Sequence, residues 1–327
     1  MKTLSSRPTL LSLAIVATLF AVCLLVARAE EGASRAKSKD ASLTSDLEKA
    51  KEKLAPTYAL AYKFQAGDEN RTKVVHLVTV ETKIKGSTQT AKTRSVSTKI
   101  WRIKDIDAEG QVVFEHVVDH VEMWSSVSGR QEIRYDSSSG EAPPPGYEQV
   151  ADSVGKVLAT VTMTPHGRVM ARTNAQPQFN PGIGELTIPF PDKPVKIGAT
   201  WSIPDELEFR LDDGTLKRVQ TRQQYKLVSV ETGLATISVE TQVLTPVNEP
   251  KIQAELVQRL QHGTIKFDLD TGRLIHKQMD MDEEVFGFNG ADSHMQYLAR
   301  FTEEPTTAEE AKPAEQTAEA EPAAEKR

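Results

Sequence analysis

Hydrophobic and polar residues alternate along much of the chain between residues 57 and 303. This two-residue period is typical of a β-strand with one apolar face. The alternation is clearest over residues 58–64, and it continues over 74–84 and 96–106. The pattern predicts strands at these three places and a fold that is mainly β.

Five short segments with a glycine at or near their end separate the β-rich runs, at residues 108–110, 165–167, 212–214, 231–233 and 270–272. Glycine adopts the positive φ angles that tight hairpins require. A series of hairpins joins neighbouring strands in antiparallel order. We therefore expect an antiparallel meander rather than a parallel sheet.

One or two short helices are expected beside the sheet. Tyr147, Val150, Ala151 and Val154 have helical spacing, and Gly155 follows as a C-terminal cap. Residues 251–262 fit either a helix or a strand.

The N-terminal segment is typical of an export signal. A basic start precedes an apolar run over residues 10–27, and Ala27-Arg28-Ala29 places small residues at the cleavage positions. We predict a signal peptide over residues 1–29, with an uncleaved anchor helix as the alternative because the apolar run just reaches membrane-spanning length. The protein is then exported, periplasmic or extracellular, and contacts a membrane only through residues 10–27 if the segment is retained.

The segments that flank the predicted β-domain have the composition of flexible chain. Residues 30–56 are expected to be a flexible linker with a short helix, because Ser45 and Glu48 form a capping box. Residues 304–327 are rich in Ala, Glu and Pro and carry a net charge of −4, which predicts a disordered acidic tail. The compact part is therefore expected to be one β-rich domain over residues 57–303.

The composition of the chain excludes several classes of function. The net charge of −6 argues against a nucleic-acid binder, which needs a basic surface. The single cysteine lies inside the signal, so neither a disulfide framework nor a cysteine-based metal cluster is expected in the exported protein. No cofactor-binding fingerprint is present. We expect no cofactor.

The segment from Pro189 to Trp201 resembles one found in exported bacterial proteins of uncharacterised families, in which a proline-rich stretch leads into V-x-x-G-x-x-W. The resemblance extends over about residues 57–303. It implies an envelope β-domain whose sheet curves into a half-barrel, distantly like that of bacterial lipoprotein carriers. It implies no catalytic residue.

Two groups of residues are candidate metal ligands. His116 and His120 have the H-x-x-x-H spacing, but the valines around them favour a strand, on which the two rings would lie roughly 13 Å apart. The acidic stretch from Asp268 to Glu284 could attract calcium, although a hairpin turn explains Asp270 and Gly272. No metal site is predicted.

Tyr58, Tyr62, Phe64 and Trp101 are the candidate ligand-binding residues, since aromatic side chains on one sheet face can line a pocket for an apolar molecule. The alternative is that they pack in the core. We expect a binding or structural module of the cell envelope without catalysis. Its partner would be an envelope protein or an apolar small molecule. The alternatives are a periplasmic carrier of an apolar ligand such as a lipid, and an envelope hydrolase with acids or histidines brought together in a cleft.

Overall fold

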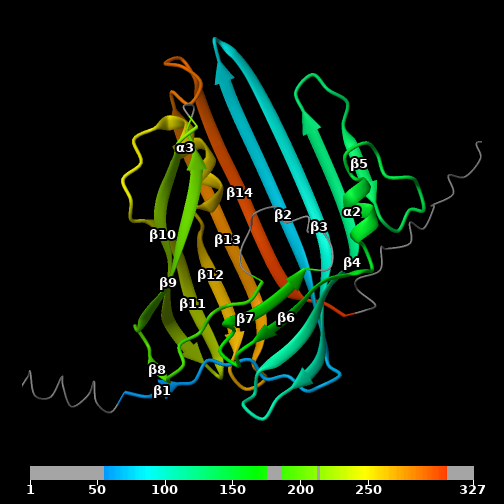
Figure 1. Ribbon diagram of the computed structural model, residues 1–327, viewed down its shortest axis with the longest axis vertical. Coiled ribbons are helices and arrows are strands. Elements are labelled where there is room, and N and C mark those ends of the chain that lie inside the picture. The colour runs from blue at the N-terminus through cyan, green and yellow to red at the C-terminus, as the bar shows by residue number, and fades with distance from the viewer. Residues whose placement is uncertain (1–54, 175–185, 212–213, 308–327) are drawn as a thin grey trace, which may run out of the picture. The chain divides into compact units, whose positions relative to one another are not determined.

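A large antiparallel sheet dominates the computed structural model, which describes residues 55–174, 186–211 and 214–307 (Figure 1). The sheet has 12 strands, and the mainly β fold predicted from the alternation is confirmed. Its order is β7-β6-β4-β3-β2-β14-β13-β12-β11-β10-β9, and β5 pairs with β4 beside this path. The last strand thus pairs with the first long strand, so the two ends of the chain's β-region meet in the middle of the sheet.

The strands of the sheet are β2 (Glu69–Ile84), β3 (Ser87–Ile106), β4 (Val112–Val127), β5 (Ile133–Asp136), β6 (Val157–Met163), β7 (Val169–Asn174), β9 (Thr200–Arg210), β10 (Leu216–Glu231), β11 (Leu234–Val243), β12 (His262–Asp268), β13 (Arg273–Phe286) and β14 (His294–Pro305). A separate pair is formed by β1 (Thr57–Tyr58) and β8 (Val195–Lys196). The helices are α2 (Glu148–Ser153), α3 (Pro250–Leu256) and the 3₁₀ turn η1 (Val257–Arg259).

All five turn segments lie between strands that pair with each other. Their glycines have positive φ, from +64° at Gly272 to +84° at Gly214. The helix predicted near residue 150 is confirmed as α2, with Gly155 at φ +75° just beyond it. The ambiguous stretch that begins at residue 251 is helical, since α3 and η1 occupy most of it.

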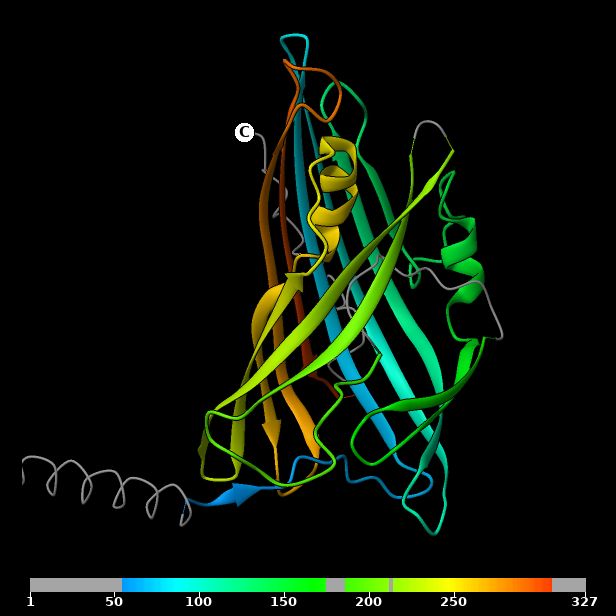
Figure 2. The same cartoon turned by 60° about the vertical axis from the view of Figure 1, so that its left-hand side comes forward.

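The sheet is strongly curved, as Figure 2 shows. One hydrophobic cluster joins Trp101 and Phe114, near one end of the strand order, to Leu227 and Ile237, near the other end. Strands so far apart in the order can share a core only if their common face is concave. The mainly β meander with a curved sheet is therefore as predicted.

The predicted strand over residues 58–64 is only partly correct. Just Thr57–Tyr58 pair, with β8, and residues 59–65, here called the strap, cross the concave face without joining a ladder. The alternation nevertheless has a structural cause, because Leu60 and Tyr62 are buried in the main cluster while Lys63 is exposed. The Tyr62 amide donates to the Pro165 carbonyl at 2.8 Å, which anchors the strap to the β6–β7 hairpin.

Gly167 in that hairpin is required by close packing. Its φ is +77°, and a Cβ at this position would collide with the Ile188 carbonyl and the Tyr62 ring. Only glycine lets the hairpin, the strap and residues 186–190 approach so closely.

The segment from Pro189 to Trp201 also holds this arrangement together. The Trp201 indole N–H donates to the Pro189 carbonyl at 2.8 Å, and β8 pairs with β1 just before the strap. Its residues therefore have a structural role.

The predicted signal, the linker helix up to residue 54 and the tail beyond residue 307 lie outside the described residues. Within the described part of the chain, no helix has the length and apolar character needed to cross a membrane.

Candidate functional site

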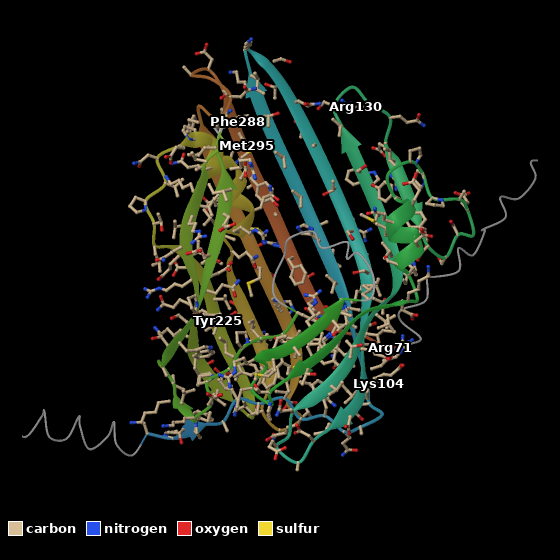
Figure 3. All side chains as sticks on the ribbon, in the orientation of Figure 1. Arg71, Lys104, Arg130, Tyr225, Phe288 and Met295 are labelled. Carbon is tan, nitrogen blue, oxygen red and sulfur yellow. The ribbon has the colours of Figure 1, made fainter. Side chains whose placement is uncertain are left out.

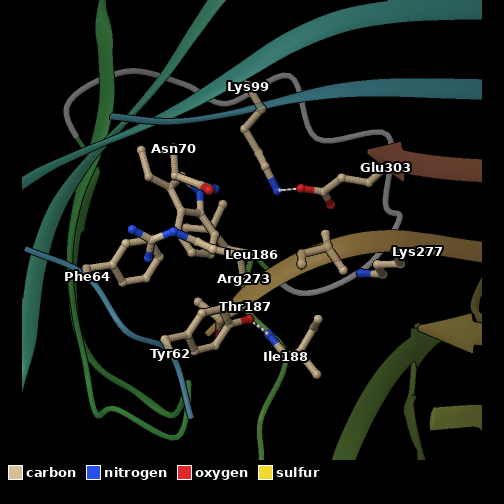
Figure 4. A pocket seen from close by; sticks show the side chains of 12 residues that line it. Tyr62, Phe64, Asn70, Lys99, Leu186, Thr187, Ile188, Arg273, Lys277 and Glu303 are labelled. Carbon is tan, nitrogen blue, oxygen red and sulfur yellow. Dashed lines mark hydrogen bonds and ion pairs between the residues drawn. The ribbon is translucent and has the colours of Figure 1, made fainter. Parts of the chain in front are cut away.

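A pocket lies where the strap and residues 186–188 cover the concave face of the sheet (Figure 4). Three aromatic residues, Tyr62, Phe64 and Trp101, form part of its wall. Charged side chains form another part, and they come from β3, β13 and β14. The pocket thus combines apolar walls with buried charge.

The charged part consists of Lys99 on β3, Lys277 on β13 and Glu303 on β14, here called the Lys–Glu–Lys cluster. Lys99 forms an ion pair with Glu303 Oε1, and the Thr72 hydroxyl donates to the same oxygen at 2.9 Å. The Glu303 side chain is only 6% exposed and that of Lys99 12%. The cluster therefore places two cations and one anion in the protein interior.

Burial by itself would raise the pKa of Glu303, but the charges of Lys99 and Lys277, together with the hydrogen bonds from Lys99 and Thr72, hold the pKa below the usual value of a glutamate. Glu303 is therefore ionised in the folded protein.

The Trp101 indole lies beside the same pocket. It is 4% exposed, and its Nε1 has no hydrogen-bond partner in the described structure. A buried donor without an acceptor is costly and uncommon. The pocket encloses ≈ 20 Å³, enough for a water molecule or the polar end of a larger molecule.

The four predicted ligand-binding residues separate into two groups. Tyr62, Phe64 and Trp101 come together at the pocket, with ring centres 5.8–6.1 Å apart. Tyr58 packs against the main cluster but does not line the pocket. The three rings also touch one another as core residues do, so they are a packed wall and not an open apolar cavity.

The Lys–Glu–Lys cluster was not among the predicted site residues, although the sequence carries a signal for it. Each member stands two residues from a buried hydrophobic residue of its own strand: Lys99 from Trp101, Lys277 from Met279 and Glu303 from Phe301. Each is therefore a charged side chain at a position where the two-residue period predicts an apolar one.

A bulge in β4 separates the two candidate metal ligands His116 and His120. Lys99 pairs with Val118 and Thr98 with His120, which leaves Asp119 as an extra residue. His116 therefore lies on the concave face opposite Trp101, whereas His120 lies on the other face and contacts Asp136 at 3.1 Å. Among the described residues, no three metal-ligating side chains are grouped.

The acidic residues between Asp268 and Glu284 also do not form one site, because individual members have separate structural roles. Asp268 accepts the amides of Asp270 and Thr271 at 2.7 and 3.0 Å, which closes the β12–β13 turn. Asp280 pairs with Arg300 at 2.6 Å on the neighbouring strand.

Two buried histidines on the concave face predict sensitivity to acid. Burial lowers the pKa of His76 to about 4. Burial, with the charges of Lys99 and Arg172, lowers that of His116 to about 3. Both rings are neutral in the fold but take up protons in the unfolded chain below about pH 6.5. The unfolded state thus binds more protons, and stability falls as the pH drops from about 6.5 toward 4.

We expect His76→Leu to reduce the pH slope of the unfolding free energy by about 1.4 kcal/mol per pH unit in this window. Urea titrations at several pH values measure the slope, which is informative even if the variant is less stable overall. His276→Leu, on the outer face beside Glu304, serves as the control. An unchanged slope for His76→Leu would show that this ring does not resist protonation.

Comparison with known proteins gives a partial match to one family and no activity. The sequence profile of a family described as "Family of unknown function (DUF6263)" matches residues 176–274, which include the segment from Pro189 to Trp201. No curated protein sequence matches the chain.

Several solved structures are similar to this chain, but with low TM-scores and low sequence identity. A structure titled "Lipid-protein interactions in lipovitellin" has a TM-score of 0.40 and 11% identity, and the match covers 78% of this chain and 26% of that one. DynF from the dynemicin biosynthesis pathway of Micromonospora chersina has a TM-score of 0.21 and 7% identity over 78% of this chain and 88% of its own. A DUF1329 family protein from Desulfovibrio piger has a TM-score of 0.14 and 10% identity, and the match covers 69% of this chain and 83% of that one. The chain thus spans about a quarter of the lipovitellin chain, and at these TM-scores we infer no function from the likenesses.

Proposed function

We propose that this protein is a non-catalytic binding module of the cell envelope and that its ligand is an amphiphile with an anionic group. The exported location rests on the signal-like residues 1–29. The observation that carries the binding proposal is the Lys–Glu–Lys cluster beside the pocket, together with the unpartnered N–H of Trp101.

A buried ionic cluster is a poor way to stabilise a fold. Moving charges out of water costs several kcal/mol for each ion, and well-packed apolar residues in their place are often neutral or stabilising. Lys99 and Glu303 lie within a concave face that is otherwise rich in valine, methionine and aromatic residues. A buried carboxylate whose pKa is shifted by neighbouring charges, next to a pocket, is typical of functional sites.

The chemistry of the pocket favours an anionic acceptor. Lysine ammonium groups and the Trp101 N–H are hydrogen-bond donors. A ligand carboxylate or phosphate would attract the ammonium groups and accept a hydrogen bond from the indole N–H. The half-exposed side chains of Phe64, Leu186 and Leu274 at the pocket would contact the apolar part of the same molecule.

Oleate and oleyl alcohol form a matched pair of probes, because they differ only in the charged end. We expect calorimetric titration of the full chain, below the micelle concentration, to show oleate binding at least about tenfold tighter than the alcohol. Lys99→Met should remove most of that preference, whereas Lys266→Met, an exposed lysine on β12, should leave it unchanged. Equal binding of both probes, or no binding of either, would contradict the proposal.

A further inference from the structure

One strand of the sheet is shorter than both of its neighbours. β12 begins at His262, which pairs with Glu240 of β11 and Asp280 of β13. Beyond this point β11 continues to Val243 and β13 to Phe286. Two strands that flank a third lie about 10 Å apart. The Thr241 amide still donates to the Gln261 carbonyl at 2.8 Å, so a slot one strand wide remains between residues 242–243 of β11 and 281–286 of β13.

Among the described residues, those that close the slot lie on its concave side. Residues 246–260 leave the sheet to form a loop, α3 and η1 (Figure 1). Val257 of η1 packs with Met281, Val285 and Met295, in the region where Figure 3 labels Phe288 and Met295. Leu256 of α3 packs with Val219 of β10 on the other side. The helical segment thus forms an apolar floor that bridges the two sides of the slot.

A cleft of ≈ 420 Å³ opens above this floor. Its apolar lining includes Val243, Leu256, Leu260 and Val285, and Glu283 and Glu284 add two acids. The volume falls within the range of ligand and side-chain pockets in proteins.

The backbone at the slot has an open edge. Residues 281–286 of β13 pair with β14 on one side, whereas their pairing with β12 ends at Asp280. In the described structure, no backbone hydrogen bond outside the strand ladders involves these six residues. An unpaired strand edge is a template for another extended chain.

The charge around the slot is negative. Asp282 and Glu284 are exposed on the outer face of β13 at this edge, and Glu283 lines the cleft. Of these, Glu284 lies 3.7 Å from His294. A partner chain with basic side chains would complement this edge.

We propose that the slot binds an extended segment of a partner protein as an added β-strand along β13. Its alternate apolar side chains enter the cleft over Leu256 and Leu260, and its basic side chains face Asp282 and Glu284. The backbone of residues 281–286 supplies the hydrogen bonds, and the acids select a basic sequence.

Fluorescence anisotropy with a labelled acetyl-(Val-Lys)₃-amide peptide and the full chain tests this. We expect the peptide to bind, (Val-Glu)₃ to bind at least about tenfold more weakly, and amide exchange of residues 281–286 to slow in the complex. Two further peptides, N-methylated either at the valines or at the lysines, separate backbone pairing from charge attraction. At least one of them should lose binding, because methylation removes the donors that face β13.

Asp282→Lys should weaken binding of the basic peptide about fivefold, while Glu231→Lys, an exposed acid at the β10–β11 turn, should not change it. Full binding of both N-methylated peptides, unchanged exchange of residues 281–286, or no binding of the basic peptide would overturn the proposal. None of these results depends on oleate binding at the Lys–Glu–Lys cluster.

Discussion

Replacement of Glu303 by alanine is expected to lower the free energy of unfolding by about 3–5 kcal/mol, because it leaves two buried lysines without their carboxylate. Lys99 and Lys277 both interact with Glu303, and the Thr72 hydroxyl also loses its acceptor. Urea unfolding followed by circular dichroism measures the change.

Glu304→Ala is the matched control for this variant. Glu304 is the next residue of β14, but it is exposed and contacts His276 on the surface at 2.8 Å. Surface pairs of this kind are worth about 0–1 kcal/mol, so the control should be nearly as stable as the wild type. If Glu303→Ala were equally mild, the Lys–Glu–Lys cluster would be well solvated, and the burial argument for a binding site would fail.

Replacement of Tyr62 by alanine is expected to have a comparable effect, about 3–5 kcal/mol. The ring lies 5.4–6.0 Å from the ring centres of Phe64, Trp101, Phe190 and Phe267, and its hydroxyl accepts the Ile188 amide at 2.9 Å. Loss of this side chain would leave a cavity where the strap meets the sheet. Denaturant unfolding of the variant measures the cost.

Tyr62→Phe separates the hydroxyl from the ring. It should cost only about 1–2 kcal/mol, since the ring packing stays and only the hydrogen bond to Ile188 is lost. A loss below about 1 kcal/mol in Tyr62→Ala would mean that the strap is not part of the core.

The periodic and local features of the fold could be predicted from the sequence. The long strands β2 and β3 follow from alternation, and the hairpins follow from glycines such as Gly233 and Gly272, whose positive φ angles the turns require. The strap could not be assigned in the same way. Its alternation of apolar and polar residues indicates which side faces the core. Whether an extended segment pairs with a strand depends on its neighbours in the fold, and the local sequence pattern does not show them.

The candidate site was predictable only in its aromatic half. Lys99, Lys277 and Glu303 are far apart in the sequence and meet because β14 pairs with β2, which brings the end of the β-region next to its beginning. That pairing is a property of the whole sheet. The bulge at Asp119, which places His116 and His120 on opposite faces, is likewise visible only in the register of β3 and β4.

The central claim is that the Lys–Glu–Lys cluster recognises an anionic ligand and is not simply part of the core. The triple variant Lys99→Met/Lys277→Met/Glu303→Leu tests it most directly, because removal of all three charges avoids an uncompensated ion and should leave the fold intact. We predict that this variant unfolds at a urea concentration close to that of the wild type and binds oleate no better than oleyl alcohol. A folded triple variant that still prefers oleate as strongly as the wild type would contradict the account.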